Sequence, residues 1–249
     1  MKYQQQPHDT ENKFTSVNNV YRKIDKKDII YNYNKINNDI HEIKIKNNIS
    51  YDINFMAVTK TVAPEYVNTA IDCGIKLLGE NRVQEYLSKK DEYRKGPDVH
   101  LIGKLQTNKV KYIINEVTMI ESLDSIKLAK EINRLAEKNN KVMDVLVEVN
   151  IGNEESKSGI KYNETEAFLE NLLQFKNIHV RGLMAIPPIN SSEEIYYKMH
   201  KLFIDIYDKK IDNINMDYLS IGMSGDYKTA IKHGSNLIRI GTGLFGSRK

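Results

Sequence analysis

The sequence predicts a single α/β domain folded as a (β/α)8 TIM barrel, with one helix leading into it. Short runs rich in β-branched residues alternate with amphipathic helical patterns, which is typical of a parallel sheet with right-handed crossovers. There are eight such runs, and 249 residues suit one barrel without a second domain. An open, doubly wound sheet remains the alternative.

The first predicted element is an amphipathic helix over residues 29–48. Its apolar residues recur every three or four positions, and they are Ile29, Ile30, Tyr33, Ile36, Ile40 and Ile43. Residues 1–28 are polar and have no sustained apolar period. We therefore expect residues 1–28 to be a poorly ordered extension and residues 29–249 to form the barrel domain.

The strands and helices of the barrel then follow in alternation. The predicted strands cover residues 55–59, 75–78, 99–102, 117–120, 142–149, 178–184, 216–221 and 237–240. The predicted helices cover residues 64–73, 82–93, 107–114, 125–138, 164–175, 193–209 and 225–233. Proline is tolerated in a first helical turn, so Pro64 fits the start of its helix.

Composition excludes several classes of protein. The net charge is +4, and the first fifty residues hold nine basic and six acidic side chains, so the remainder is almost neutral. This distribution argues against a nucleic-acid or membrane-surface protein. No apolar run is long enough to span a bilayer, and the single cysteine suits a reducing compartment, so we expect a cytoplasmic protein. The six histidines lack ligand spacing, so no metal site is predicted.

Lys60 ends the first predicted strand and is the first candidate for chemistry. In barrels of this type, active sites lie at the carboxyl ends of the strands. The buried run Phe-Met-Ala-Val-Thr would deliver Lys60 to the barrel mouth, where desolvation makes an amine nucleophilic towards carbonyl groups. The alternative is a lysine that merely reaches solvent.

Glycines and hydroxyls follow the last two predicted strands, where barrels commonly hold phosphate. Ser224 lies between two glycines and is expected to open the next helix, and Gly-Thr-Gly occupies residues 241–243. Glycine permits close approach of the backbone to a ligand, and Thr242 adds a hydroxyl donor. Ordinary turns are the alternative interpretation.

Two further polar residues are placed to face the barrel mouth. Arg239 shares its side of the last strand with Gly241, so it could contact a ligand or form an internal salt bridge. Asn81 follows the second strand and could bind a ligand oxygen or cap the next helix.

Seven ordered motifs make the chain resemble the pyridoxal phosphate homeostasis protein family, over nearly all of residues 35–249. They are Ala-Val-Thr-Lys-Thr (57–61), Gly-Glu-Asn-Arg-Val-Gln-Glu (79–85), Ile-Gly-Lys-Leu-Gln-Thr-Asn-Lys (102–109), Ser-Lys-Ser-Gly (156–159), Arg-Gly-Leu-Met (181–184), Ser-Ile-Gly-Met-Ser (220–224) and Arg-Ile-Gly-Thr-Gly-Leu-Phe-Gly (239–246). Two positions depart from the family: Thr59 replaces a common Ser, and Lys104 replaces a common His.

The resemblance implies a barrel similar to the N-terminal domain of alanine racemase, with pyridoxal 5′-phosphate (PLP) held as a Schiff base on Lys60. The other residues that it carries over are Ser224, Gly241 and Thr242 for the phosphate, Arg239 for the pyridine nitrogen, and Met223 and Asn81 for the ring pocket. An arginine at the ring nitrogen opposes its protonation and weakens the cofactor as an electron sink. The implied role is therefore a monomeric PLP carrier in vitamin B6 homeostasis, without evident catalysis. PLP-dependent apoenzymes are its expected partners.

Two other functions remain open from the residues. An amino-acid racemase would need a second acid or base opposite Lys60, usually a tyrosine from another domain, and no motif marks one. A class I aldolase could use Lys60 on a sugar-phosphate carbonyl, for which the barrel and phosphate site are equally suitable.

Overall fold

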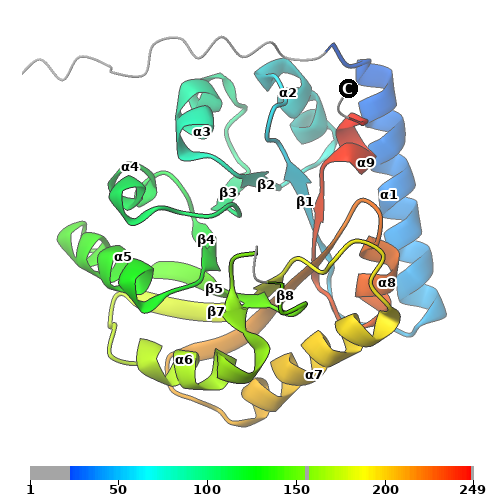
Figure 1. Ribbon diagram of the computed structural model, residues 1–249. Coiled ribbons are helices and arrows are strands. Elements are labelled where there is room, and N and C mark those ends of the chain that lie inside the picture. The colour runs from blue at the N-terminus through cyan, green and yellow to red at the C-terminus, as the bar shows by residue number, and fades with distance from the viewer. Residues whose placement is uncertain (1–22, 155–156, 248–249) are drawn as a thin grey trace, which may run out of the picture.

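The computed structural model describes residues 23–154 and 157–247, so most of the predicted extension lies outside the described residues. Strands form a central barrel that helices surround (Figure 1). The strands are β1 Asn54–Val58, β2 Leu77–Glu80, β3 Asp98–Leu101, β4 Met119–Leu123, β5 Met143–Asn150, β6 Ile160–Lys161, β7 Ile178–Ala185, β8 Ile214–Met223 and β9 Leu237–Ile240.

Strand pairing closes the sheet into a barrel. The order is β4-β3-β2-β1-β9-β8-β7-β5, all pairs are parallel, and β4 also pairs with β5. This last pairing confirms the predicted eight-stranded barrel over the open sheet. The short β6 pairs with the carboxyl-terminal end of β5. It was not predicted, because two residues give no apolar run.

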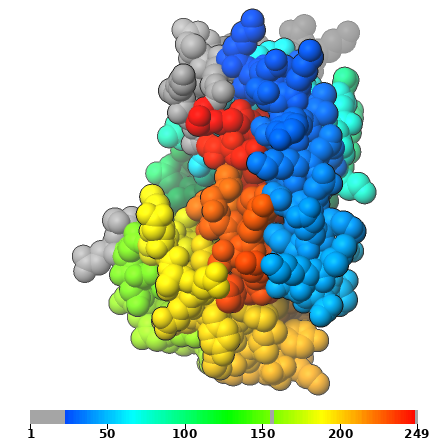
Figure 2. Space-filling view, turned by 90° about the vertical axis from the view of Figure 1, so that its right-hand side faces the viewer, coloured from blue at the N-terminus to red at the C-terminus, as the bar shows by residue number. Residues whose placement is uncertain are grey.

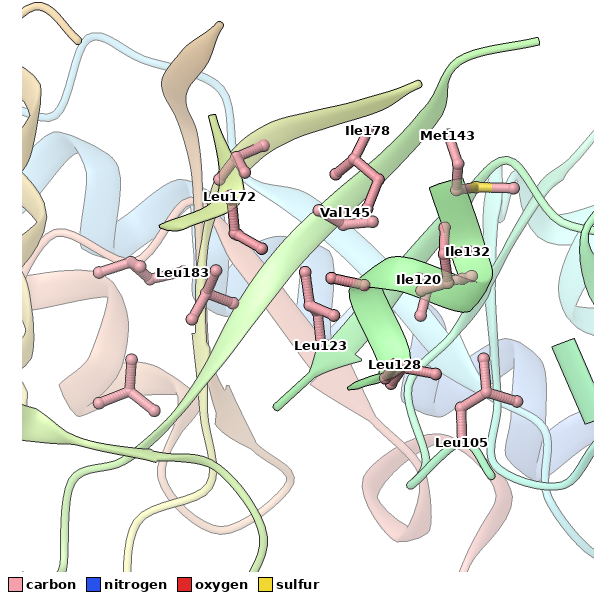
Figure 3. Packing of buried hydrophobic residues seen from close by; sticks show 14 of the residues in the cluster. Leu105, Ile120, Leu123, Leu128, Ile132, Met143, Val145, Leu172, Ile178 and Leu183 are labelled. Carbon is pink, nitrogen blue, oxygen red and sulfur yellow. The ribbon is translucent and has the colours of Figure 1, made fainter. Parts of the chain in front are cut away.

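Successive strand residues alternate between the barrel interior and the surrounding helices, as the pleat requires. In β1, Met56 and Val58 join a small interior cluster with Leu146 and Met184, whereas Ala57 packs with the outer helices. The largest apolar cluster fills the space between the barrel and its helices, including α5 (Figure 3). Inward residues that follow a strand, such as Lys60, therefore reach the barrel mouth.

The helices follow the strands as the alternation predicts. They are α1 Lys26–Lys46, α2 Pro64–Cys73, α3 Val83–Lys89, α4 Val110–Ile113, α5 Ile126–Lys138, α6 Thr165–Leu172, α7 Glu193–Asp208, α8 Tyr227–Lys232 and α9 Thr242–Phe245. Helix α1 begins three residues before the expected Ile29, because the Asp25 side chain accepts the Lys27 amide at 2.9 Å and caps it. None of the helices in the described residues has the length and apolarity needed to cross a membrane.

Helix α1 lies on the outside of the barrel and packs against α2, α8 and α9 (Figure 2). Its inward face buries Ile29, Ile36, Ile40 and Ile43. The Asn32 side-chain amide donates to the Leu244 carbonyl of α9 at 3.0 Å. Helix α1 thereby supports the segment that follows β9.

Candidate functional site

One cavity at the barrel mouth brings all the predicted site residues together. Its volume is about 540 Å³, and it opens at the carboxyl ends of β1, β2, β8 and β9. The seven predicted residues that line it are Lys60, Asn81, Met223, Ser224, Arg239, Gly241 and Thr242. The other lining residues are the apolar Val58, Ile102 and Ile186 together with Gly225 and Ser247.

Lys60 is half-buried and sits in a turn that directly follows β1. The Val62 amide donates to the Thr59 carbonyl at 3.1 Å, which closes the turn around Lys60 and Thr61. Thr59 itself packs on the outer side of the strand and is fully buried. The alternation of the strand therefore directs Lys60 into the cavity.

The segments that follow β8 and β9 are joined at Ser224. The Gly243 amide donates to the Ser224 hydroxyl oxygen at 2.9 Å. Helix α8 begins only at Tyr227, so the expectation that Ser224 opens it is wrong. Met223 and Asp226 instead form a tight turn, in which the Asp226 carboxylate accepts the Met223 amide at 2.6 Å.

Gly241 leaves room in the cavity. A Cβ atom on Gly241 would lie 3.5 Å from Val58, which lines the same cavity, so any side chain there would take space from a ligand. Thr242 is the first residue of α9 and is exposed at the cavity edge. Backbone and hydroxyl donors are therefore both accessible at the end of β9.

Arg239 is almost completely buried, with 3% of its surface exposed. Its guanidinium donates to the Ser220 carbonyl at 2.7 Å, the Ser220 hydroxyl at 2.5 Å and the Ala185 carbonyl at 2.8 Å. Burial lowers the pKa of Arg239, whereas the negative charges of Glu121 and Glu148 act to raise it. The guanidinium of an arginine remains protonated in proteins. Within the described residues Arg239 makes no direct salt bridge, so the alternative predicted for it is wrong.

A buried acid lies behind Arg239, and sequence reasoning missed it. The Ser220 hydroxyl donates to Glu121 at 2.6 Å, and Nδ1 of His100 lies 2.7 Å from the other Glu121 oxygen. Burial alone would raise the pKa of Glu121, but the hydrogen bond and charge of His100, with Arg239 and Ser220, hold it below its usual range. Glu121 therefore stays ionised and balances Arg239 through a shared hydroxyl.

Asn81 does not cap a helix. The residue at the N-cap position of α3 is Arg82, and Oδ1 of Asn81 is buried without a hydrogen-bond partner among the described residues. Such an unpaired atom is costly, so its place in the cavity wall favours the ligand-binding alternative.

Among the residues that the structure describes, no group of three or more His, Cys, Asp or Glu side chains could hold a metal ion.

Comparisons with known proteins agree with this fold. The family model of the alanine racemase N-terminal domain matches residues 24–249. A pyridoxal phosphate homeostasis protein of Aquifex aeolicus is 45% identical over 199 residues, which cover 78% of this chain and 86% of that protein. The structure of PipY from Synechococcus elongatus PCC7942 with PLP bound has a TM-score of 0.72 at 26% identity and covers 84% of this chain and 99% of PipY.

The alanine racemase of Clostridium difficile shares the fold. Its structure has a TM-score of 0.67 at 17% identity, over 84% of this chain and 56% of the racemase. At this identity the likeness concerns architecture alone.

Proposed function

Since the chain belongs to the pyridoxal phosphate homeostasis protein family, we propose that it binds PLP in the cavity at the barrel mouth. The aldehyde carbon of PLP is joined to Lys60 as a Schiff base, and the protein serves PLP homeostasis without catalytic turnover. The observation that carries the proposal is the convergence of the seven predicted residues on one cavity.

The residues present fit the chemistry of PLP. The Lys60 amine adds to the aldehyde carbon and water leaves, so a C=N bond replaces C=O without any oxidant. Ser224, Gly241 and Thr242 offer hydroxyl and amide donors to the phosphate, and Asn81 has a buried oxygen that lacks a partner. The donors suit the phosphate oxygens of the ligand, and the Asn81 oxygen could accept a hydrogen bond from the ligand.

The absence of turnover is the part of the proposal that Arg239 supports. A guanidinium has donors and no acceptor, so it cannot accept a hydrogen bond from a protonated pyridine nitrogen. An unprotonated ring stabilises a carbanion poorly, and PLP enzymes that remove α-protons depend on that stabilisation. The curated relatives are likewise named homeostasis proteins and not enzymes.

Titration with PLP tests the proposal. The wild type should develop the visible absorbance band of the protein-bound Schiff base. Lys60→Ala should lack this band but still bind PLP weakly through its phosphate and ring. Lys104→Ala is the matched control, because Lys104 lines the adjoining cavity, and it should keep the band. A colourless wild type, or a band that survives in Lys60→Ala, would contradict the proposal.

The partners of the protein belong to the same proposal. We infer that it acts in the cytoplasm as a monomer and passes PLP to PLP-dependent apoenzymes. Mixing the PLP-loaded protein with an apoenzyme should restore activity to the apoenzyme, and size-exclusion chromatography should give one monomeric peak. No activation beyond that given by the same concentration of released PLP would contradict direct transfer.

A further inference from the structure

We propose that Glu85 and Lys89 of α3 are positioning residues for Lys60. They hold the backbone on both sides of Lys60 so that its amine is presented to an aldehyde at the barrel mouth. This inference rests on the proposed function, because it concerns how the same lysine is aimed.

Two side chains of one helix grip the turn around Lys60. The Lys89 ammonium donates to the Thr59 carbonyl at 2.8 Å, and the Thr61 amide donates to the Glu85 carboxylate at 2.5 Å. The same Glu85 oxygen lies 2.9 Å from the Lys89 ammonium. An ion pair thus spans the turn, with one member fixed on each side of Lys60.

The turn has a conformation that must be held in place. Thr61 has a φ of +60°, in the left-handed region that β-branched residues rarely adopt. Residues held there persist when several surrounding contacts determine them, and they cluster at ligand sites. The Glu85 carboxylate binds the amide of this strained residue, so it stabilises the conformation that the turn requires.

These contacts with the turn are held in place because the Lys89 side chain is buried within a network of polar partners. The Lys89 side chain is 1% exposed and lies 3.3 Å from Glu80, which is itself fully buried. Glu80 accepts hydrogen bonds from the Thr59 hydroxyl at 2.7 Å and the Tyr93 hydroxyl at 2.8 Å. Buried ion pairs of this kind add little stability in general, but they can fix one arrangement of the groups they contact.

The alternation of β1 separates this network from the cavity. Thr59 and its partners lie on the helix side of the sheet, and Lys60 faces the barrel mouth. Neither Glu85 nor Lys89 lines the 540 Å³ cavity, so neither is expected to touch the cofactor. They would act through the backbone of Lys60 alone.

Two ligands separate positioning from binding. PLP can form the Schiff base, whereas pyridoxine 5′-phosphate has an alcohol in place of the aldehyde and binds without a covalent bond. In Glu85→Ala the apparent PLP affinity should fall about tenfold or more, as expected for losing a charge-assisted hydrogen bond. The affinity for pyridoxine 5′-phosphate should stay close to that of the wild type.

Three further variants test the cause. Glu85→Gln keeps an oxygen for the Thr61 amide and should recover most of the PLP affinity. Lys89→Met should resemble Glu85→Ala if it folds. Lys90→Met is the matched control. Lys90 is the residue after Lys89, and its 2.7 Å ion pair is with Glu116 and not with the turn around Lys60, so this variant should bind both ligands normally.

The inference is overturned if Glu85→Ala binds PLP as the wild type does, or if it loses both ligands equally. Glu85→Gln failing as badly as Glu85→Ala would also overturn it, since the acceptor for Thr61 would then not be the cause. A wild type that binds PLP without any Schiff base would instead contradict the proposed function, and the two failures are therefore distinguishable.

Discussion

At the scale of single residues, the site depends on how a buried cation is satisfied. Arg239 has carbonyl partners on two other strands, and the Ser220 hydroxyl links it to the carboxylate of Glu121. That hydroxyl accepts from Arg239 and donates to Glu121, so it serves two buried charges at once. Removing it should leave both charges short of a partner.

Ser220→Ala tests this link. We expect the free energy of unfolding to fall by about 1–3 kcal/mol, because buried charged groups lose hydrogen bonds that water does not replace. Urea denaturation of the two proteins measures the difference, and Ser50→Ala is the control because Ser50 is exposed. Equal stability of Ser220→Ala and the wild type would show that the hydroxyl does not connect the charges.

The phosphate contacts give a second prediction at this scale. Replacing Ser224 and Thr242 by Ala should weaken PLP more than pyridoxal, because hydrogen bonds to a charged group contribute about 1.5–3 kcal/mol each and pyridoxal lacks the phosphate. Backbone amides near Gly241 should soften the loss. Equilibrium titration of both ligands measures it, and equal losses for the two would place the phosphate elsewhere.

At the scale of elements, α1 is an addition to the strand and helix alternation that braces one side of the barrel. It contacts α9 through Asn32 and α8 through Asp39, which accepts the Tyr227 hydroxyl at 2.6 Å and lies 2.7 Å from the Lys228 ammonium. Helices α8 and α9 follow the strands whose ends carry Ser224 and Thr242. Helix α1 therefore helps to position the two helices beside the predicted phosphate site.

Asp39 makes this brace sensitive to acid. Burial opposes its ionisation, but hydrogen bonds from Lys228 and Tyr227 outweigh that effect and lower the pKa of Asp39. A carboxyl whose pKa is lower in the folded state stabilises the protein above its unfolded pKa, and this stability is lost as the pH falls through the folded pKa. The brace should thus weaken below about pH 4.

Asp39→Asn should accordingly lower the free energy of unfolding at pH 7, and its difference from the wild type should shrink below about pH 4. Urea denaturation across this pH range measures the effect. Asp52→Asn is the control, because Asp52 is fully exposed and its pair with Lys44 contributes little. A difference that stays constant with pH would mean that the Asp39 charge is not responsible.

At the scale of the whole molecule, the fold could be predicted because periodicity is a local signal. Strand and helix alternation indicates a parallel sheet, but its closure also needs the pairing of β1 with β9, which lie far apart in the sequence. Element ends were less accurate: the helix expected to begin at Gly225 starts at Tyr227, since a turn at Met223 precedes it.

Some residues of the candidate site could be predicted from the sequence, and others could be found only from the structure. Motifs at strand ends and the family resemblance indicated Lys60 and six of the other residues that line the cavity. Glu121 lies inside a strand and Lys89 lies in a helix, so nothing local distinguishes them from ordinary polar residues, and Ser220 appears only as part of a family motif without a role of its own. Their roles depend on which side chains the barrel brings beside them, such as Arg239 and the Thr59 carbonyl.

The whole protein is also expected not to racemise amino acids. Fast removal of an α-proton needs a positioned acid or base on each face and a ring that accepts charge, and Arg239 opposes the second condition. Loss of one positioned acid or base typically slows exchange about 10²–10⁴-fold. PLP-loaded protein should therefore give marginal deuterium incorporation at Cα of L- and D-alanine in heavy water.

An alanine racemase serves as the positive control for this exchange. Incorporation at ordinary enzyme turnover that disappears in Lys60→Ala would contradict the carrier function. Incorporation that is equal in wild type and Lys60→Ala would come from free PLP and would leave the prediction intact.

Borohydride reduction tests whether PLP is bound covalently to Lys60. Reduction converts the Schiff base to a stable secondary amine, which peptide mapping by mass spectrometry can locate. We expect a pyridoxyl group on the peptide that contains Lys60 and none on that peptide in Lys60→Ala. A pyridoxyl group found solely on other lysines, or none after reduction of the PLP-saturated protein, would contradict this expectation.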